Sequence, residues 1–132
     1  MVLRLLLSTM LVFICGHAAY AGSQCYATPE VEAEQLLRLH SQLMVVAITC
    51  HTTSDGQNLV PAYTGFTKNN IQTLHEAEQV MKRYYKQVYG GDGVAQLDKL
   101  RTRLGNEYGQ KIADLSAPIF CQNYRDEAMR LC

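Results

Sequence analysis

The first 21 residues constrain what this chain can fold into more than any other segment. They carry one basic residue, Arg4, then an apolar run from Leu5 to Ile14, and they end in Ala19-Tyr20-Ala21, with a small residue at positions 19 and 21. This order is typical of a secretory signal peptide. The apolar run is about ten residues long, well short of the roughly twenty that a membrane-spanning helix needs. We therefore expect cleavage after Ala21, export to the periplasm or the cell exterior, and a domain at residues 22–132 without a transmembrane anchor.

Export changes how the cysteines are interpreted. Cys15 lies in the expected signal peptide, which leaves Cys25, Cys50, Cys121 and Cys132 in the domain. Four cysteines in an oxidising compartment predict two disulfides, with three possible pairings. We favour nested loops, Cys25 with Cys132 and Cys50 with Cys121, because they would tie the chain ends together and clamp the first helix to the last. One disulfide with two free thiols is the alternative.

Apolar residues recur at helical spacing through the rest of the chain. Turn-forming residues at 52–58 and the glycines at 90–93 separate these periodic stretches, and no stretch alternates as a strand would. Short connections make successive helices neighbours. We therefore predict an all-α fold, a small disulfide-stapled antiparallel bundle of about four helices. The expected helices span residues 29–51, 60–88, 94–115 and a short segment from Pro118 onward.

Several local features refine this prediction. Thr28 before Pro29 is typical of a capped helix start. The apolar character of residues 43–48 favours a central position for the first helix. Asparagines at 69 and 70 indicate a kink within the second helix. Gly105 and Gly109, four residues apart, are interpreted as a close helix crossing.

No motif for catalysis, metal binding or cofactor binding stands out. The closest cysteines, Cys121 and Cys132, are too far apart for a disulfide-exchange motif. His75-Glu76 lacks the second histidine of a zinc-protease helix, and the glycines at 90–93 lack the lysine of a phosphate loop. We expect no catalytic residue, no metal and no cofactor. A hydrolase with scattered catalytic residues remains an alternative.

One stretch is unusually basic. Tyr84, Tyr85 and Tyr89 are interleaved with it, and Asp92 and Asp98 are its only acids. Its cations are Lys82, Arg83, Lys86, Lys99, Arg101 and Arg103.

These residues predict a basic, tyrosine-edged end of the bundle if the two helices meet at the glycine turn. Such an end would fit an anionic partner: lipid headgroups, a polysaccharide or an acidic protein face. A solvated helix surface with inward tyrosines is the alternative. Without Arg4 the domain has 11 Lys and Arg against 12 Asp and Glu, a net charge near minus one. Together with export, this charge argues against a nucleic-acid partner.

Four segments carry a family resemblance. They are residues 43–50, ending in Thr49-Cys50, residues 63–66, residues 100–106 and Phe120-Cys121. In these segments the chain resembles a group of small exported proteobacterial proteins of unassigned function. The resemblance implies a disulfide between Cys50 and Cys121. Gly105 departs from the alanine that is usual in the group.

Taken together, these patterns favour a non-enzymatic, periplasmic or secreted helical domain that binds a protein or a component of the cell envelope. The first alternative is a small stress chaperone whose apolar surface becomes available on partial opening. The second is the small hydrolase mentioned above. The oligomeric state and the identity of the partner stay open.

Overall fold

A computed structural model describes residues 25–53 and 58–132. The expected signal peptide and its cleavage site lie outside these residues. The described part of the chain is all-helical, which confirms the predicted class, but it forms five helices where about four were expected. These are α1 (Thr28–Cys50), α2 (Leu59–Asn69), α3 (Ile71–Tyr89), α4 (Val94–Leu115) and α5 (Ala117–Leu131).

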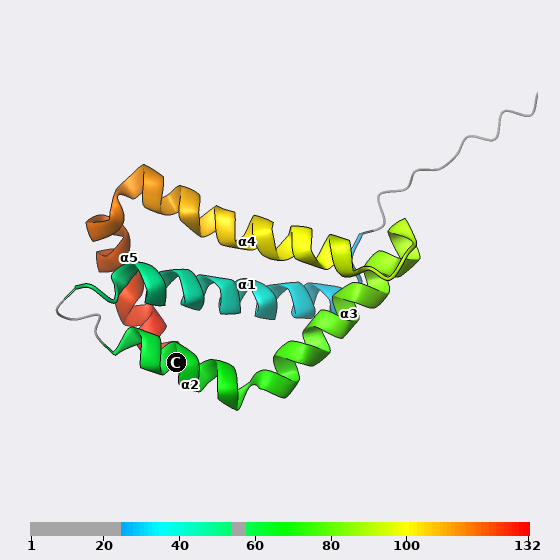
Figure 1. Ribbon diagram of the computed structural model, residues 1–132, viewed down its shortest axis with the longest axis horizontal. Helices are drawn as coiled ribbons and strands as arrows, with labels where there is room; N and C mark the ends of the chain where they lie inside the picture. Colours follow the sequence, from blue (N-terminus) through cyan, green and yellow to red (C-terminus); the bar gives the residue numbers. More distant parts are fainter. Residues whose placement is uncertain (1–24, 54–57) are drawn as a thin grey trace, which may run out of the picture.

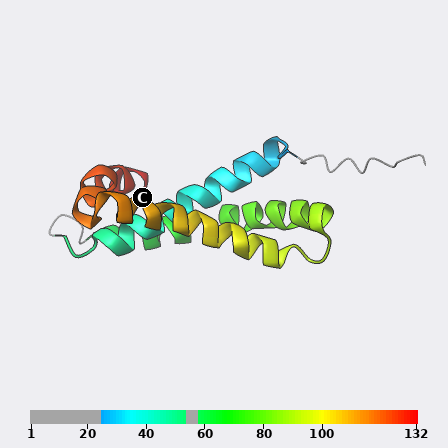
Figure 2. The ribbon, with the colours of Figure 1, turned by 90° about the horizontal axis from the view of Figure 1, so that it is seen from above.

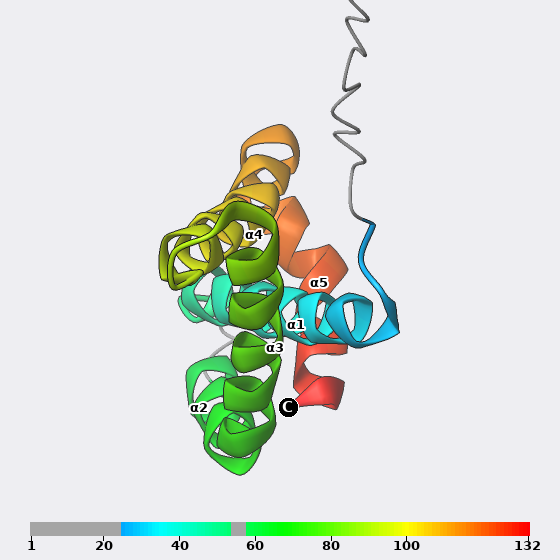
Figure 3. The same ribbon diagram turned by 90° about the vertical axis from the view of Figure 1, so that its right-hand side faces the viewer.

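Helix α1 lies at the centre of the molecule and contacts each of the other four helices (Figure 1). The end-on view shows the other helices placed around it (Figure 3). Its buried positions, which include Leu37, Leu43 and Val46, follow the helical spacing of the sequence. The predicted central place of the first helix is therefore confirmed.

The extra helix arises from a break at Asn70. The Asn70 side-chain amide donates to the Phe66 carbonyl at 2.8 Å, and its backbone N–H donates to the same oxygen at 3.0 Å. Asparagine favours turns over helix interiors, because its side chain competes for backbone groups, and the backbone angles of Asn70, φ −111° and ψ 13°, lie outside the helical region. The predicted kink is therefore a complete boundary, and the chain changes direction between α2 and α3 (Figure 1).

The path of the chain is antiparallel for most of its length. Helices α2 and α3 together run opposite to α1, and α4 runs opposite to α3 (Figures 1 and 2). Helix α5 departs from a simple bundle, because it lies across one end of α1 rather than alongside it (Figure 3).

The buried apolar side chains form two clusters along α1. The first, which we call the hairpin core, joins α1 to α3 and α4. It consists of Ala33, Leu37, Ala77, Met81, Tyr85, Leu97, Leu100 and Leu104. The second, the disulfide core, joins the other end of α1 to α2 and α5. It consists of Leu43, Val46, Ala47, Cys50, Leu59, Phe120, Cys121 and Ala128.

The start of α1 differs from its prediction. The helix begins at Thr28, and Ala27 is the capping residue, without a side-chain cap. The Ala27 carbonyl accepts the backbone N–H groups of Glu30 and Val31, each at 3.1 Å. Pro29 sits in the first turn, where its missing N–H removes no helical hydrogen bond.

The glycine turn between α3 and α4 stops the helix as predicted. Gly90, Gly91 and Gly93 all have positive φ, and Asp92 accepts the backbone N–H of Val94 at 3.0 Å. A side chain at Gly93 would collide with the Lys82 carbonyl oxygen. The turn therefore requires glycine there both for its backbone angle and for space.

The expected close crossing at Gly105 and Gly109 is wrong. A Cβ atom at either position would meet no heavy atom within 4 Å. Across the described residues, none of the helices is both long and apolar enough to cross a bilayer.

Candidate functional site

A concave site lies where the start of α1 meets the α3–α4 hairpin. Its volume is about 320 Å³. We call it the tyrosine pocket, and it is lined by Tyr26, Tyr84, Tyr85, Tyr89, Gln96, Lys99, Leu100 and Arg103. Three separate parts of the chain supply its walls: Tyr26, which precedes α1, the last turns of α3 and the first turns of α4.

Helical spacing places these residues together. Tyr85 and Tyr89 are four apart on α3, and Gln96, Lys99 and Arg103 follow one another at steps of three and four on α4. Residues at this spacing share one helix face. The glycine turn then folds the two faces toward a common space.

The four tyrosines form one connected aromatic group. Tyr26 and Tyr84 pack edge to face with ring centres 4.8 Å apart, and Tyr84 and Tyr85 do so at 5.5 Å. Tyr85 and Tyr89 are tilted at 6.1 Å. Such pairs stabilise by about 0.5–1.5 kcal/mol beyond burial of their area. This aromatic group therefore fixes the shape of the pocket.

A hydroxyl pair closes the pocket toward α1. The hydroxyl groups of Tyr26 and Tyr85 lie 2.9 Å apart, and either can donate. Burial raises the pKa of the Tyr26 hydroxyl well above its usual value, and the hydrogen bond to Tyr85 and the neighbouring Glu34 carboxylate raise it further. Tyr26 therefore stays neutral at physiological pH and can act as a hydrogen-bond donor.

The charge of the pocket is positive. Lys99 and Arg103 are its two charged lining residues, and no carboxylate lines it among the described residues. Glu34, on α1, lies 3.9 Å from the Arg103 guanidinium and 2.8 Å from that of Arg38. Arg38 in turn pairs with Glu107. Glu34 thus partly balances the charge of Arg103 from outside the pocket. The lining itself holds no acid that could balance the charge of Lys99 among the described residues.

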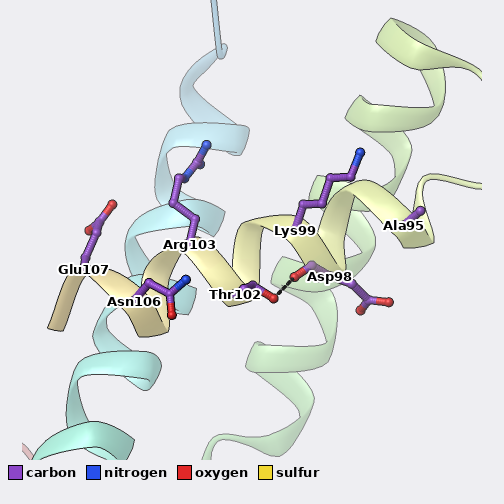
Figure 4. A pocket seen from close by; sticks show the side chains of 7 residues that line it. All are labelled: Ala95, Asp98, Lys99, Thr102, Arg103, Asn106 and Glu107. Atoms are coloured by element: carbon purple, nitrogen blue, oxygen red, sulfur yellow. Dashed lines mark hydrogen bonds between the residues drawn. The ribbon is translucent and has the colours of Figure 1, made fainter. Parts of the chain in front are cut away.

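A larger hollow of about 610 Å³ adjoins the tyrosine pocket and shares Lys99 and Arg103 with it. All of its lining residues belong to α4, and Figure 4 shows Lys99, Arg103 and Glu107 projecting to the same side of that helix. Asp98 and Glu107 also line it, so its charges are mixed. Because one helix supplies the whole lining, this hollow is an open surface, and the tyrosine pocket is the better-formed site.

The predicted basic patch is only partly brought together. Lys99 and Arg103 enter the tyrosine pocket, but Arg101 projects elsewhere on α4. Arg101 pairs with Glu78 and lies 3.4 Å from Asp98. The other three cations, Lys82, Arg83 and Lys86, belong to α3 and are not among the residues that line the pocket.

One of the two favoured disulfides, Cys50–Cys121, is confirmed, and the other, Cys25–Cys132, is wrong. Cys50 and Cys121 form a disulfide that joins α1 to α5. Cys25 and Cys132, expected to pair, are exposed free thiols within the described residues. Cys25 precedes α1 and Cys132 follows α5, which packs at the opposite end of α1. A helix of 23 residues is about 35 Å long, whereas a disulfide requires Cα atoms within about 7 Å.

Sequence reasoning missed three residues of the pocket lining: the polar residues Tyr26 and Gln96, and Leu100 of the apolar stripe. Tyr26 lies outside every helix, so helical periodicity gives no signal for it. Gln96 could have been found from its spacing to Lys99 and Arg103.

A second polar contact, at His40 of α1, also escaped prediction. The Tyr63 hydroxyl lies 3.0 Å and the Thr67 hydroxyl 3.2 Å from His40 Nε2, and the ring of Tyr63 stacks on the imidazole. Burial lowers the pKa of His40; the nearby Glu78 carboxylate opposes this effect and Arg101 adds to it. Helix α2 is therefore attached to α1 through an imidazole that is half buried and preferentially neutral.

Comparison of this chain with protein-family models, curated proteins and solved structures finds no match. The site must therefore be interpreted from its own chemistry.

Proposed function

We propose that this protein is an exported, non-enzymatic binding protein that holds an anionic component of the cell envelope in the tyrosine pocket. The observation that carries this proposal is the lining itself: Lys99 and Arg103 stand in a concave, aromatic-walled site without a lining carboxylate among the described residues. Its volume lies near the lower end of the roughly 300 to 1,000 Å³ of small-ligand sites. A cleft with charge of one sign attracts ligands of the opposite sign.

Export supports the same proposal from the sequence. The signal-peptide pattern of residues 1–21 predicts that the domain works in the envelope or outside the cell, where acidic polysaccharides and lipid headgroups are found. The Cys50–Cys121 disulfide agrees with an oxidising compartment.

Binding to an immobilised polyanion tests the proposal. The protein should be retained on dextran sulfate at low ionic strength and released as salt is raised, because screening weakens the contact. The double variant Lys99→Gln, Arg103→Gln should elute at clearly lower salt.

The matched control is Lys82→Gln, Lys86→Gln, which removes the same charge from residues outside the pocket lining. This control should elute close to the unmodified protein. Equal losses in both double variants would mean that net charge, rather than the pocket, determines retention, and would refute the proposal.

The His40 contact favours a second candidate, a stress chaperone that opens in acid. Protonation of His40 places a charge between α1 and α2 and weakens their contact. Partial release of α2 would expose Tyr63 and Phe66, which pack against the disulfide core. If this candidate is correct, lowering the pH should increase hydrophobic-dye binding and suppress aggregation of a client protein. Absence of both effects would eliminate it.

A further inference from the structure

The residues that line the tyrosine pocket indicate which kind of anion it would bind. We propose that the ligand is a carboxylated sugar ring, such as a uronic acid unit of an acidic polysaccharide. This inference rests on the proposed binding function and specifies its ligand class.

The charge of the pocket fits one carboxylate. Lys99 and Arg103 bring two positive charges, and Glu34 lies 3.9 Å from the Arg103 guanidinium. Glu34 is largely buried, with 16% of its side chain exposed. Salt therefore screens its attraction to Arg103 only weakly. Glu34 also pairs with Arg38, and Arg38 pairs with Glu107. Three cations and two acids therefore surround this end of the pocket, which leaves a net charge of about one positive unit for a ligand. A singly charged carboxylate matches it better than a phosphate monoester, which is close to doubly charged at neutral pH.

The walls fit a ring with polar edges. Every lining side chain except that of Leu100 carries a polar group. The Gln96 amide and the tyrosine hydroxyls offer neutral donors and acceptors, which suit the hydroxyl groups of a sugar. An acyl chain or an unsubstituted aromatic ring would leave these groups unpaired, which costs free energy.

Tyr89 supplies the accessible aromatic face. The residue is 64% exposed, so it belongs to the rim rather than to the hairpin core. The face of an aromatic ring is electron-rich. The weakly positive C–H groups on one side of a sugar ring can therefore pack against it. The volume of about 320 Å³ limits the bound part to one or two sugar units.

Calorimetry with a digalacturonate probe tests the inference on the purified protein. Neutral digalactose and sodium acetate at equal ionic strength serve as comparison ligands. We expect digalacturonate to bind at least tenfold more tightly than either, because only this probe combines the ring with the carboxylate. Equal binding of acetate would reduce the site to a simple anion site and overturn the inference.

Variants separate the parts of the recognition. Tyr89→Leu should weaken digalacturonate binding about tenfold, in line with the energy of an aromatic contact. Tyr89→Phe keeps the ring and should stay within about threefold of the unmodified protein. Lys99→Gln should abolish the preference for digalacturonate over digalactose, whereas Lys86→Gln should preserve it. A Tyr89→Leu variant with unchanged affinity would overturn the stacking role.

The absence of tryptophan gives an independent readout, since the chain has eight tyrosines and no stronger fluorophore. Digalacturonate should change the tyrosine fluorescence of the protein, and the Tyr89→Phe variant should show a smaller change. If digalacturonate gives neither heat nor a fluorescence change while retention on dextran sulfate still depends on Lys99 and Arg103, the sugar-acid inference fails and the proposed anion-binding function stands. If that retention is also independent of these two residues, both fail.

Discussion

At the scale of single residues, His40 shows how one buried group can link stability to pH. Its imidazole contacts Tyr63 and Thr67 of α2, with Glu78 of α3 and Arg101 of α4 nearby. Burial keeps its folded-state pKa below the ordinary 6.5. The unfolded chain therefore binds this proton at higher pH than the folded chain does. The stability contributed by neutral His40 is fully present above the unfolded pKa and is lost as the pH falls below it.

The prediction at this scale concerns the free energy of unfolding of the unmodified protein and of the His40→Gln variant. The free energy of unfolding of the unmodified protein, measured by urea titration, should fall between about pH 7.5 and about pH 5.5, by no more than about 1.4 kcal/mol per pH unit for one proton, and the urea midpoint should fall with it. Glutamine has no titrating group, so the His40→Gln variant should show a smaller fall.

The exposed residue His75 provides the control, because His75→Gln removes an imidazole from the surface of α3. Its pH dependence should match that of the unmodified protein. A midpoint that is equal at both pH values in the unmodified protein would contradict the role of His40.

At the scale of helices, α4 carries two glycines that the fold does not require. Gly109 is exposed in the interior of the helix, and a Cβ atom there would meet nothing within 4 Å. Glycine in a helix interior is less favourable than alanine by about 1 kcal/mol, mainly because its unfolded backbone is more flexible.

We therefore expect Gly109→Ala to raise the free energy of unfolding by about 1 kcal/mol and the melting temperature by roughly 4 °C. Thermal unfolding followed by circular dichroism measures this. The contrasting variant Gly93→Ala should lower the melting temperature, because Gly93 has φ of +76° and lies against the Lys82 carbonyl. A destabilised Gly109→Ala variant would reveal a contact at that surface.

The boundaries of the helices were largely predictable from the sequence, but the way in which the helices pack together was not. Periodicity predicted the extent of α1 and α4, because those helices keep one apolar stripe along their length. Asn69 and Asn70 indicated a kink, but the sequence does not give the backbone angles of Asn70, φ −111° and ψ 13°, which end α2 there. The prediction of a close crossing at Gly105 and Gly109 is wrong because the spacing of glycines alone does not show whether they face another helix.

The tyrosine pocket was predictable only in part for a similar reason. Tyr84, Tyr85 and Tyr89 were recognised because they interleave with cations along the chain. Arg101 was grouped with Lys99 although the two residues point to different sides of α4. Tyr26 reaches the pocket through tertiary packing of the chain before α1, which leaves no periodic signal.

At the scale of the whole molecule, one disulfide rather than the expected two defines the covalent framework of residues 25–53 and 58–132. Cys50 and Cys121 close a loop with a sequence separation of 71 residues, and both are buried in the disulfide core. In the loop-entropy account, a loop of this length stabilises the fold by about 4 kcal/mol. The hairpin core, by contrast, is held by side-chain packing.

Native thiol labelling tests this framework. In the chain cleaved after Ala21, two thiols, those of Cys25 and Cys132, should react without denaturant, because both are exposed and free. The intact mass should lie two hydrogens below that of the reduced chain, as one disulfide requires. Reduction should lower the free energy of unfolding by about 4 kcal/mol. Failure of both native thiols to react would instead support the nested pairing.

The position of the disulfide has a topological consequence for the tyrosine pocket. Residues 50–121 form a closed covalent ring that contains α2, α3 and α4, while α1 leaves this ring as a tail that lies along it. Tyr84, Tyr85, Tyr89 and the α4 residues belong to the ring, but Tyr26 belongs to the tail. Fraying of the first turns of α1 would therefore remove one wall of the pocket without opening the ring. The Tyr26 side of the pocket can therefore separate from the rest by local unfolding. A bound ligand should oppose this separation and slow amide hydrogen exchange at the start of α1 more than anywhere in the disulfide core.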